Sequence, residues 1–228
     1  MPAERTAVVT GVSSGIGRAI AARLLSDGWA VIGLSRREPD LVGKGLTWRH
    51  CDLAQLERIG STVSGIENAD ALVHAAGLQM SGRLGALDPE AGDRMYAVHV
   101  GAAVRIANSL VTRMADGGRI LLIGSRTASG AAGKSQYAAT KAALRGLARS
   151  WAMELAPRRI TVNVIEPGPT DTAMLSDPAR AETPPVVPPL GRLIHPDDVA
   201  AMAAFLLTDT GSMVTGQQVV ICGGASIS

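Results

Sequence analysis

Thr6-Ala7-Val8-Val9-Thr10-Gly11-Val12-Ser13-Ser14-Gly15-Ile16-Gly17 is the segment that specifies the fold most clearly. Its first five residues form an apolar run that stops at Gly11, as a buried strand does, and residues 16–25 then repeat apolar side chains at helical spacing. Glycines between a strand and a helix permit a tight turn and let the backbone approach an anion closely. The next helix directs free N–H groups and the positive end of its dipole at that anion. The stretch therefore favours a site for a dinucleotide phosphate over an ordinary strand-to-helix turn.

The rest of the chain continues this alternation of strand and helix. Further strand-like runs lie at residues 29–34, 47–51, 71–74, 120–123, 161–165 and 218–221, and the longest helical patterns span 89–114 and 135–155. We predict an α/β fold, a Rossmann-like doubly wound parallel sheet with helices on both faces, formed by residues 1–228 as a single domain. Ligands of such sheets bind beyond the carboxyl ends of the strands, where the strand order reverses.

One segment departs from this composition. Residues 176–190 carry five prolines, and we interpret them either as a substrate loop or as a plain surface connection.

Composition excludes several classes of protein. The 228 residues are 46% hydrophobic and 18% charged, which is typical of a folded chain and not of a disordered one. Net charge is +2 and no basic run exceeds two residues, so we expect no nucleic-acid partner. No apolar run approaches the roughly 20 residues that a membrane span needs, so we expect a cytoplasmic protein without a membrane partner. His50 and His195 have no acid or cysteine partner at ligand spacing, and we predict no metal site.

The candidate catalytic residues are Ser125, Tyr137 and Lys141. The tyrosine and the lysine are four residues apart in a helical pattern, so they share one face of the helix. An ammonium beside a phenol favours the phenolate and lowers the pKa of the phenol, which lets the tyrosine pass a proton near neutral pH. Together with the glycine turn, this pair indicates hydride chemistry on a carbonyl or an alcohol.

The end of the second predicted strand bears on the choice of cofactor. Dinucleotide-binding folds often place an acid there to bind the ribose hydroxyls, but this chain has Ser35-Arg36-Arg37. An arginine there clamps a 2′-phosphate through charge-assisted hydrogen bonds. We therefore expect NADP(H) as the preferred cofactor, with NAD(H) as the alternative. The arginines have a second interpretation, in which one or both are solvated and bind no cofactor.

In their order along the chain, these motifs resemble those of the short-chain dehydrogenase/reductase family, and the resemblance covers essentially the whole chain. The glycine turn matches the family's Thr-Gly-x-x-x-Gly-x-Gly, and Tyr137 with Lys141 matches its Tyr-x-x-x-Lys. Asp52-Leu53 matches the pair at the adenine ring, and Pro167-Gly168-Pro169-Thr170-Asp171-Thr172 matches the segment at the nicotinamide end. The spacing of the tyrosine and the lysine argues against the family's enoyl-reductase branch.

The resemblance implies roles for these residues. Tyr137 would exchange a proton with the substrate oxygen, Ser125 would hydrogen-bond that oxygen, and Lys141 would bind the nicotinamide ribose. It implies a homodimer or homotetramer that acts on a small carbonyl or alcohol substrate. The residues expected to contact the cofactor are Gly11, Ser13, Ser14, Gly15, Ile16, Gly17, Ser35, Arg36, Arg37, Asp52, Leu53, Ala75, Ala76, Gly77, Tyr137, Lys141, Pro167, Gly168, Thr170 and Thr172.

The chain also departs from the family pattern. His99 stands where the family has an asparagine that is thought to hold a water of a proton relay, so we interpret it as a relay member or as a filler of a polar helix position. His74 and Ala75 replace both asparagines of Asn-Asn-Ala-Gly. These changes keep open a rival interpretation, a cofactor-binding sensor without turnover.

Substrate contacts are predicted from position alone. Gln79, Met80, Met174 and Leu175 lie near expected strand ends, and Arg126 is expected to point to solvent, the alternative being contact with an anionic substrate.

Overall fold

A seven-stranded parallel sheet organises the molecule, which is described here by a computed structural model covering residues 5–41, 43–176 and 183–227. The strand order is β3-β2-β1-β4-β5-β6-β7, and every neighbouring pair is parallel. The strands are β1 (Thr6–Thr10), β2 (Ala30–Ser35), β3 (Leu46–His50), β4 (Ala69–His74), β5 (Met114–Ile123), β6 (Thr161–Pro167) and β7 (Gln218–Ile221). The order reverses between β1 and β4, so the carboxyl ends of these two central strands flank the expected position for a ligand.

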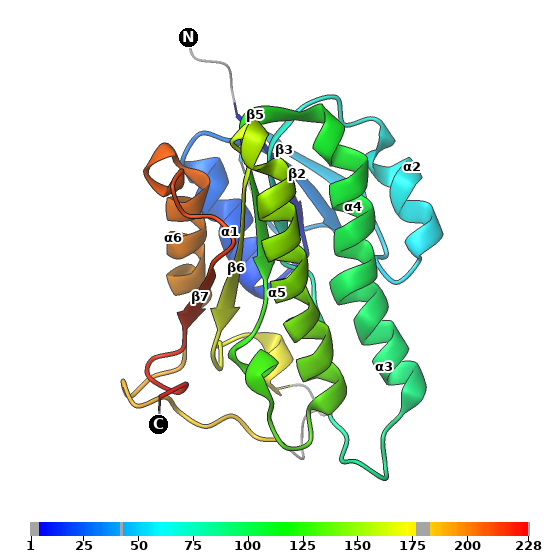
Figure 1. Cartoon of the computed structure of the whole chain (residues 1–228), viewed down its shortest axis with the longest axis vertical. Helices are drawn as coiled ribbons and strands as arrows, with labels where there is room; N and C mark the ends of the chain where they lie inside the picture. The colour runs from blue at the N-terminus through cyan, green and yellow to red at the C-terminus, as the bar shows by residue number, and fades with distance from the viewer. Residues whose placement is uncertain (1–4, 42, 177–182, 228) are drawn as a thin grey trace.

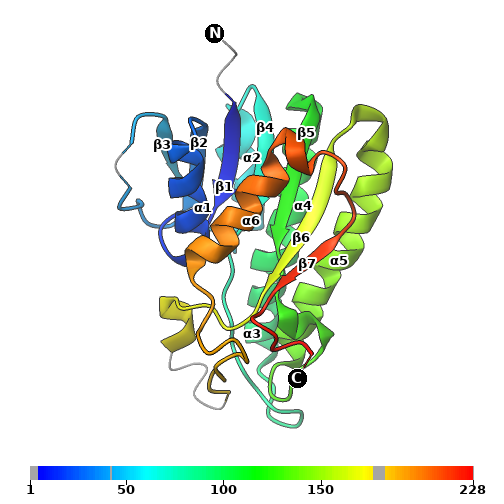
Figure 2. The same ribbon diagram turned by 90° about the vertical axis from the view of Figure 1, so that its left-hand side faces the viewer.

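Helices cover both faces of the sheet (Figures 1 and 2). Helices α1 and α6 pack together on one face, and α2, α4 and α5 lie on the other. The helices are α1 (Gly15–Ser26), α2 (Ile59–Ser64), α3 (Pro89–Tyr96), α4 (Ala102–Leu110), α5 (Ser135–Leu155) and α6 (Pro196–Leu207).

Alternate side chains of the central strands feed two apolar layers. Val8 and Leu72 point toward the α2, α4 and α5 side, whereas Val9 and Val73 point toward α1 and α6. All four are fully buried, as expected for strands covered on both faces. The predicted doubly wound parallel sheet with helices on both faces is confirmed.

The helical pattern predicted at 89–114 is confirmed over residues 89–113, but it is not one regular α-helix. It divides into α3, a π-helical segment at Ala97–Gly101, α4 and a short 3₁₀ turn at Val111–Arg113, and residue 114 already belongs to β5. A π-helical turn frees backbone groups from the regular ladder, and it persists where side chains satisfy them. Here the ring of His74 reaches the carbonyl oxygen of Val98, at 3.0 Å.

Two sequence expectations concern segments outside the sheet. The predicted substrate loop 176–190 falls partly on residues 177–182, which lie outside the described residues. Its described part lies beside the residues that follow β7, because the backbone N–H of Leu190 donates to the carbonyl of Gly223, at 3.0 Å. No helix within the described ranges combines the length and apolar character required to cross a bilayer.

Candidate active site

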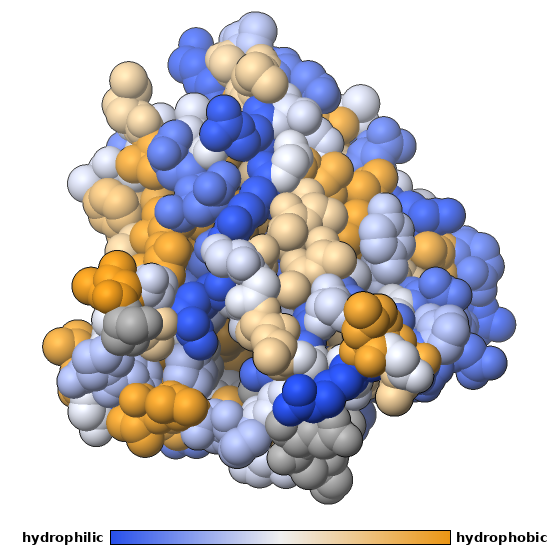
Figure 3. Space-filling model, turned by 60° about the horizontal axis from the view of Figure 1, so that its bottom comes forward, coloured by the Kyte–Doolittle hydropathy of each residue, from blue (hydrophilic) through white to orange (hydrophobic). Residues whose placement is uncertain are grey.

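A cavity of about 450 Å³ opens at the carboxyl ends of the strands. This edge of the molecule comes forward in the space-filling view, where hydrophilic and hydrophobic side chains are interspersed (Figure 3). All 20 predicted cofactor contacts line this cavity, and so does Ser125. The structure thus brings together residues from positions 11 to 172 of the chain.

The glycine turn forms one wall of the cavity. Gly11 adopts φ +75°, and a Cβ there would lie 2.9 Å from the Cα of Ala76. A Cβ at Gly17 would collide with the carbonyl oxygen of Gly11, so α1 approaches the turn more closely than other residues permit. Ser14, the residue before α1, makes no side-chain cap, and the first turn of the helix has no acid. The N-terminus of α1 therefore fits an anionic phosphate.

The turn after β2 presents two guanidinium groups to the same cavity. Ser35 fixes this turn, because its Oγ donates to the carbonyl of Arg37 at 2.6 Å and accepts from Nε1 of Trp48 at 3.1 Å. Arg36 and Arg37 are exposed, line the cavity and make no side-chain hydrogen bond or ion pair with another described residue. The turn therefore fits a phosphate ester at this end of the cavity.

Ser125 lies just beyond the end of β5 and is buried. Its Oγ accepts the backbone N–H of Thr127 at 3.1 Å, which fixes the side chain at the start of a 3₁₀ turn. The hydroxyl keeps its own proton for donation into the cavity.

Tyr137 and Lys141 lie one turn apart near the start of α5, and both are buried. The Nζ atom of Lys141 is 5.9 Å from the centre of the tyrosine ring. It donates to the carbonyl oxygen of Ile123, at 2.8 Å. Complete burial lowers the pKa of Lys141 to about 7, because the charged form loses its hydration.

His99 lies behind this pair and does not line the cavity. The hydroxyl of Thr140 donates to the carbonyl of Tyr137 at 2.8 Å, so the Nδ1–H of His99 donates to that hydroxyl, also at 2.8 Å. Nε2 accepts the backbone N–H of Leu78, at 3.1 Å. Burial and the nearby Lys141 hold the pKa of His99 well below 6.5. The ring is therefore neutral with both nitrogens paired, and its part in a proton relay stays a prediction.

His74 links the two central strands to the π-helical segment. Thr10 accepts the backbone N–H groups of Ala75 and Ala76 at 3.0 Å, so its hydroxyl donates to Nδ1 of His74, at 3.2 Å. The Nε2–H of His74 then donates to Val98. Burial lowers the pKa of His74 to about 4. Side-chain hydrogen bonds thus persist where the family's first asparagine is absent.

The positional predictions for substrate contacts have mixed outcomes. Gln79, Met174 and Leu175 line the cavity, whereas Met80 does not. The expectation that Arg126 points to solvent is wrong. Its side chain is partly buried in the cavity wall, because Nη1 donates to the carbonyl of Ala225 at 2.9 Å.

Sequence reasoning missed other cavity residues. They come from strand ends, loops and the helical segments before α4, outside any motif, and include Leu34, Leu78, Arg94, Val98, Ile123 and Lys134. Pro184 and Val186 also line the cavity and belong to the described part of the predicted substrate loop 176–190. Within the described part of the chain, no three His, Cys, Asp or Glu side chains gather as a metal site would require.

A glycine turn at the switch point of a parallel sheet, beside a buried tyrosine and lysine, defines a dinucleotide-binding α/β protein of the oxidoreductase type. Comparison with known proteins supports this class. The family model described as enoyl-(acyl carrier protein) reductase matches residues 11–226. The chain belongs to the short-chain dehydrogenase/reductase family of oxidoreductases.

Individual relatives differ in their names. The chain is 36% identical to the 3-oxoacyl-[acyl-carrier-protein] reductase FabG of Salmonella typhimurium, over 96% of each chain. It is 32% identical to a cyclic-di-GMP-binding biofilm dispersal mediator protein of Escherichia coli, again over 96% of each. Among solved structures, the angucycline C-6 ketoreductase LanV with bound NADP matches with a TM-score of 0.86 and 29% identity, over 98% of this chain and 96% of that one.

Proposed function

We propose that this chain is an NADP(H)-dependent oxidoreductase that interconverts a ketone and a secondary alcohol, with Tyr137 as general acid and base. The observation that carries the proposal is the convergence of Ser125, Tyr137 and Lys141 on the cavity that the glycine turn also lines. NADP bound to the ketoreductase LanV supports the choice of cofactor. When bound, the nicotinamide supplies or accepts the hydride.

The protein's own groups handle the substrate oxygen. In reduction, the Ser125 hydroxyl donates a hydrogen bond to the carbonyl oxygen and Tyr137 gives its phenolic proton to the same oxygen as the hydride reaches the carbon. In oxidation, the phenolate of Tyr137 takes the proton back. Tyr137 is the third residue of α5, so the positive end of the helix dipole stabilises its phenolate, and the ammonium form of Lys141 does the same.

The cofactor groups fit the cavity at two places. The N-terminus of α1 offers uncapped N–H groups for the pyrophosphate, and Arg36 and Arg37 offer guanidinium groups that pair with no other described residue for a 2′-phosphate. An NAD-linked dehydrogenase of the same fold is the alternative.

The decisive experiment is NADPH oxidation followed at 340 nm with a panel of ketones and one enoyl thioester. We expect turnover of ketones, and loss of about 10²-fold or more in kcat for Tyr137→Phe with NADPH affinity retained. Tyr96→Phe removes the same hydroxyl from the exposed second tyrosine of the chain and is the matched control. Full activity of Tyr137→Phe contradicts the mechanism, and turnover of the enoyl thioester alone contradicts the reaction.

The name of the cyclic-di-GMP-binding relative gives one rival a specific basis, namely a ligand-binding sensor without turnover. NADPH binding without oxidation by any ketone of the panel, together with binding of cyclic di-GMP, would favour that rival. Retention of Ser125, Tyr137 and Lys141 around one cavity favours the enzyme.

A further inference from the structure

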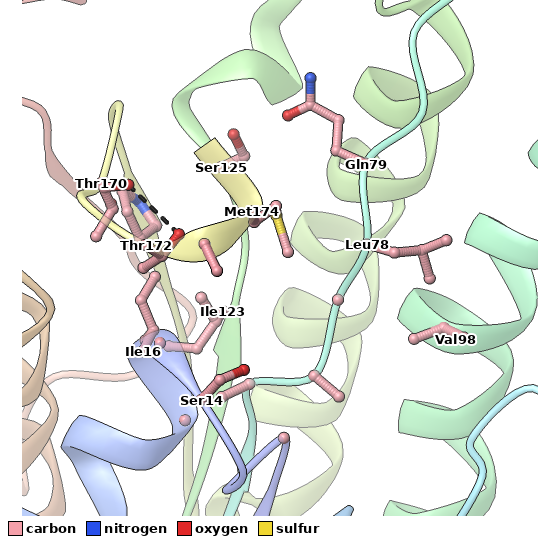
Figure 4. Close-up of a pocket in the computed structure, with 18 of the residues that line it drawn as sticks. Ser14, Ile16, Leu78, Gln79, Val98, Ile123, Ser125, Thr170, Thr172 and Met174 are labelled. Atoms are coloured by element: carbon pink, nitrogen blue, oxygen red, sulfur yellow. Dashed lines mark hydrogen bonds between the residues drawn. The ribbon is translucent and has the colours of Figure 1, made fainter. Parts of the chain in front are cut away.

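Gln79 is a polar side chain enclosed by the candidate site, and its amide nitrogen has no partner among the described residues. Only 7% of the residue is exposed, and its Nε2 is buried without a hydrogen-bond partner in the described structure. In the close-up, the amide lies at the Ser125 and Met174 end of the cavity, away from Ser14 and Ile16 at the phosphate end (Figure 4). Gln79 thus belongs to the part of the cavity where a substrate would meet Ser125.

A second unpaired donor lines the same cavity. The Nε–H of Arg126 is also buried without a partner in the part of the chain that the structure describes, whereas Nη1 of the same side chain donates to the carbonyl of Ala225. Gln79 follows β4 and Arg126 follows β5, and these strands are neighbours in the sheet. Two of the three buried side-chain nitrogens that lack a partner in the described residues are therefore in this cavity.

Buried donors without partners are costly, so their concentration in one cavity indicates that a bound molecule satisfies them. The reacting carbonyl oxygen of a ketone has two lone pairs, and the hydroxyls of Ser125 and Tyr137 use both. The amide of Gln79 consequently needs another acceptor atom. Leu78, Val98 and Met174 add apolar side chains to the lining of the same cavity, and a hydrogen bond is stronger in apolar surroundings than in water.

We propose that Gln79 determines substrate specificity by donating a hydrogen bond to a second acceptor oxygen of the substrate, near the reacting ketone. The inference rests on the proposed function and names its substrate class as oxo compounds that carry an ester, carboxylate or further carbonyl oxygen. A site built around such a hydrogen bond rejects an analogue that lacks the acceptor, because the buried donor is then left unpaired.

The test compares two ketones of equal chain length with saturating NADPH. Ethyl 3-oxobutanoate carries the second acceptor, and 2-heptanone replaces its ester group by methylenes. We expect Gln79→Leu to lower kcat/KM for the keto ester about tenfold or more and to change kcat/KM for 2-heptanone less than about twofold. Because the measure is the ratio of the two substrates within each variant, intrinsic ketone reactivity and the fraction of active enzyme cancel when variants are compared.

Three further variants sharpen the result. Gln79→Met repeats the loss of donors with a flexible side chain, and Gln79→Glu removes the amide donors while keeping the shape, so both are expected to lower the ratio. Gln217→Leu makes the same change as Gln79→Leu at an exposed position near β7 and is expected to leave the ratio as in the wild type.

The outcomes separate this inference from the proposed function. An unchanged ratio in Gln79→Leu, or an equal loss on both ketones, overturns the role of Gln79 and leaves the oxidoreductase intact. A wild type that reduces 2-heptanone as well as or better than the keto ester overturns the substrate class. A wild type that oxidises NADPH with other ketones of the panel but with neither of these two also overturns it, whereas failure with every ketone overturns the function itself.

Discussion

The ammonium nitrogen of Lys141 donates to the carbonyl oxygen of Ile123, at 2.8 Å. This contact ties α5 to β5, two residues before Ser125, so the three candidate catalytic residues are held in one rigid unit. The contact requires the ammonium group to be fully buried, and this loss of hydration lowers the pKa of Lys141 from 10.5 to about 7. Because burial of a charged group lowers stability, we expect Lys141 to support activity at the expense of the free energy of unfolding.

We predict that Lys141→Met abolishes turnover but stabilises the protein near pH 7. Between about pH 7 and 10 the unfolded chain keeps a proton on Lys141 that the folded chain has lost, so the stability of the wild type rises with pH relative to the variant, by up to about 4 kcal/mol. Urea unfolding at both pH values measures the difference. Lys44→Met, at an exposed lysine, should show no such trend. An equal effect of Lys141→Met at both pH values would contradict the prediction.

A second pH effect is expected from His99. Its pKa is held well below 6.5 in the folded chain, so as pH falls below 6.5 the unfolded chain takes up a proton that the folded chain does not, and stability is lost. His99→Asn should flatten this acid limb by up to about 2 kcal/mol between pH 6.5 and 5. Unfolding in urea at the two pH values tests it, with the exposed His50→Asn as the control. A slope identical to that of the wild type would show that His99 is protonated in the folded chain.

Gly77 offers a steric probe of the same region. A Cβ at Gly77 would lie 3.3 Å from Nε2 of His99 and 3.5 Å from Nζ of Lys141. The contact with His99 is the tight one, so Gly77→Ala should shift that ring, which packs edge-on against Tyr137, and lower kcat/KM about tenfold or more, since small misplacements in a site are costly. Gly146→Ala, in the middle of α5 with nothing near its Cβ, should keep full activity and gain up to about 1 kcal/mol of stability. Unchanged kcat/KM in Gly77→Ala would show that His99 and Lys141 tolerate a methyl group beside them.

The sequence allowed prediction of the features that depend on local pattern. The apolar run 6–10 and the glycine turn after it specify β1 and α1 because buried strands and tight turns have their own residue requirements. All 20 proposed cofactor contacts line one cavity, and matching short motifs in their order along the chain was enough to predict this set.

Features that depend on tertiary partners could not be predicted in this way. The π-helical segment around His99 depends on the ring of His74, which is distant in sequence. The direction of Arg126 depends on the carbonyl of Ala225, 99 residues later. Whether Gln79 finds a partner depends on every wall of the cavity at once, and no periodicity in the chain carries that information.

In the proposed function, Arg36 and Arg37 determine whether the protein prefers NADPH or NADH. A guanidinium that pairs with no other described residue is available for charge-assisted hydrogen bonds with a 2′-phosphate, and NADH has no such group. We therefore expect Arg36→Ser and Arg37→Ser, tested singly, to identify at least one arginine whose loss raises the Kd for NADPH about tenfold or more and changes the Kd for NADH less than about twofold.

Fluorescence titration of the reduced nicotinamide measures both affinities without turnover, so the result does not depend on finding the substrate. Arg149→Ser removes an equal charge from an exposed position on α5 and controls for a general change in electrostatic attraction. Equal weakening of both cofactors would assign the arginines a general electrostatic role. A wild type that binds NADH as tightly as NADPH would show that the protein does not recognise the 2′-phosphate and would favour the NAD-linked alternative.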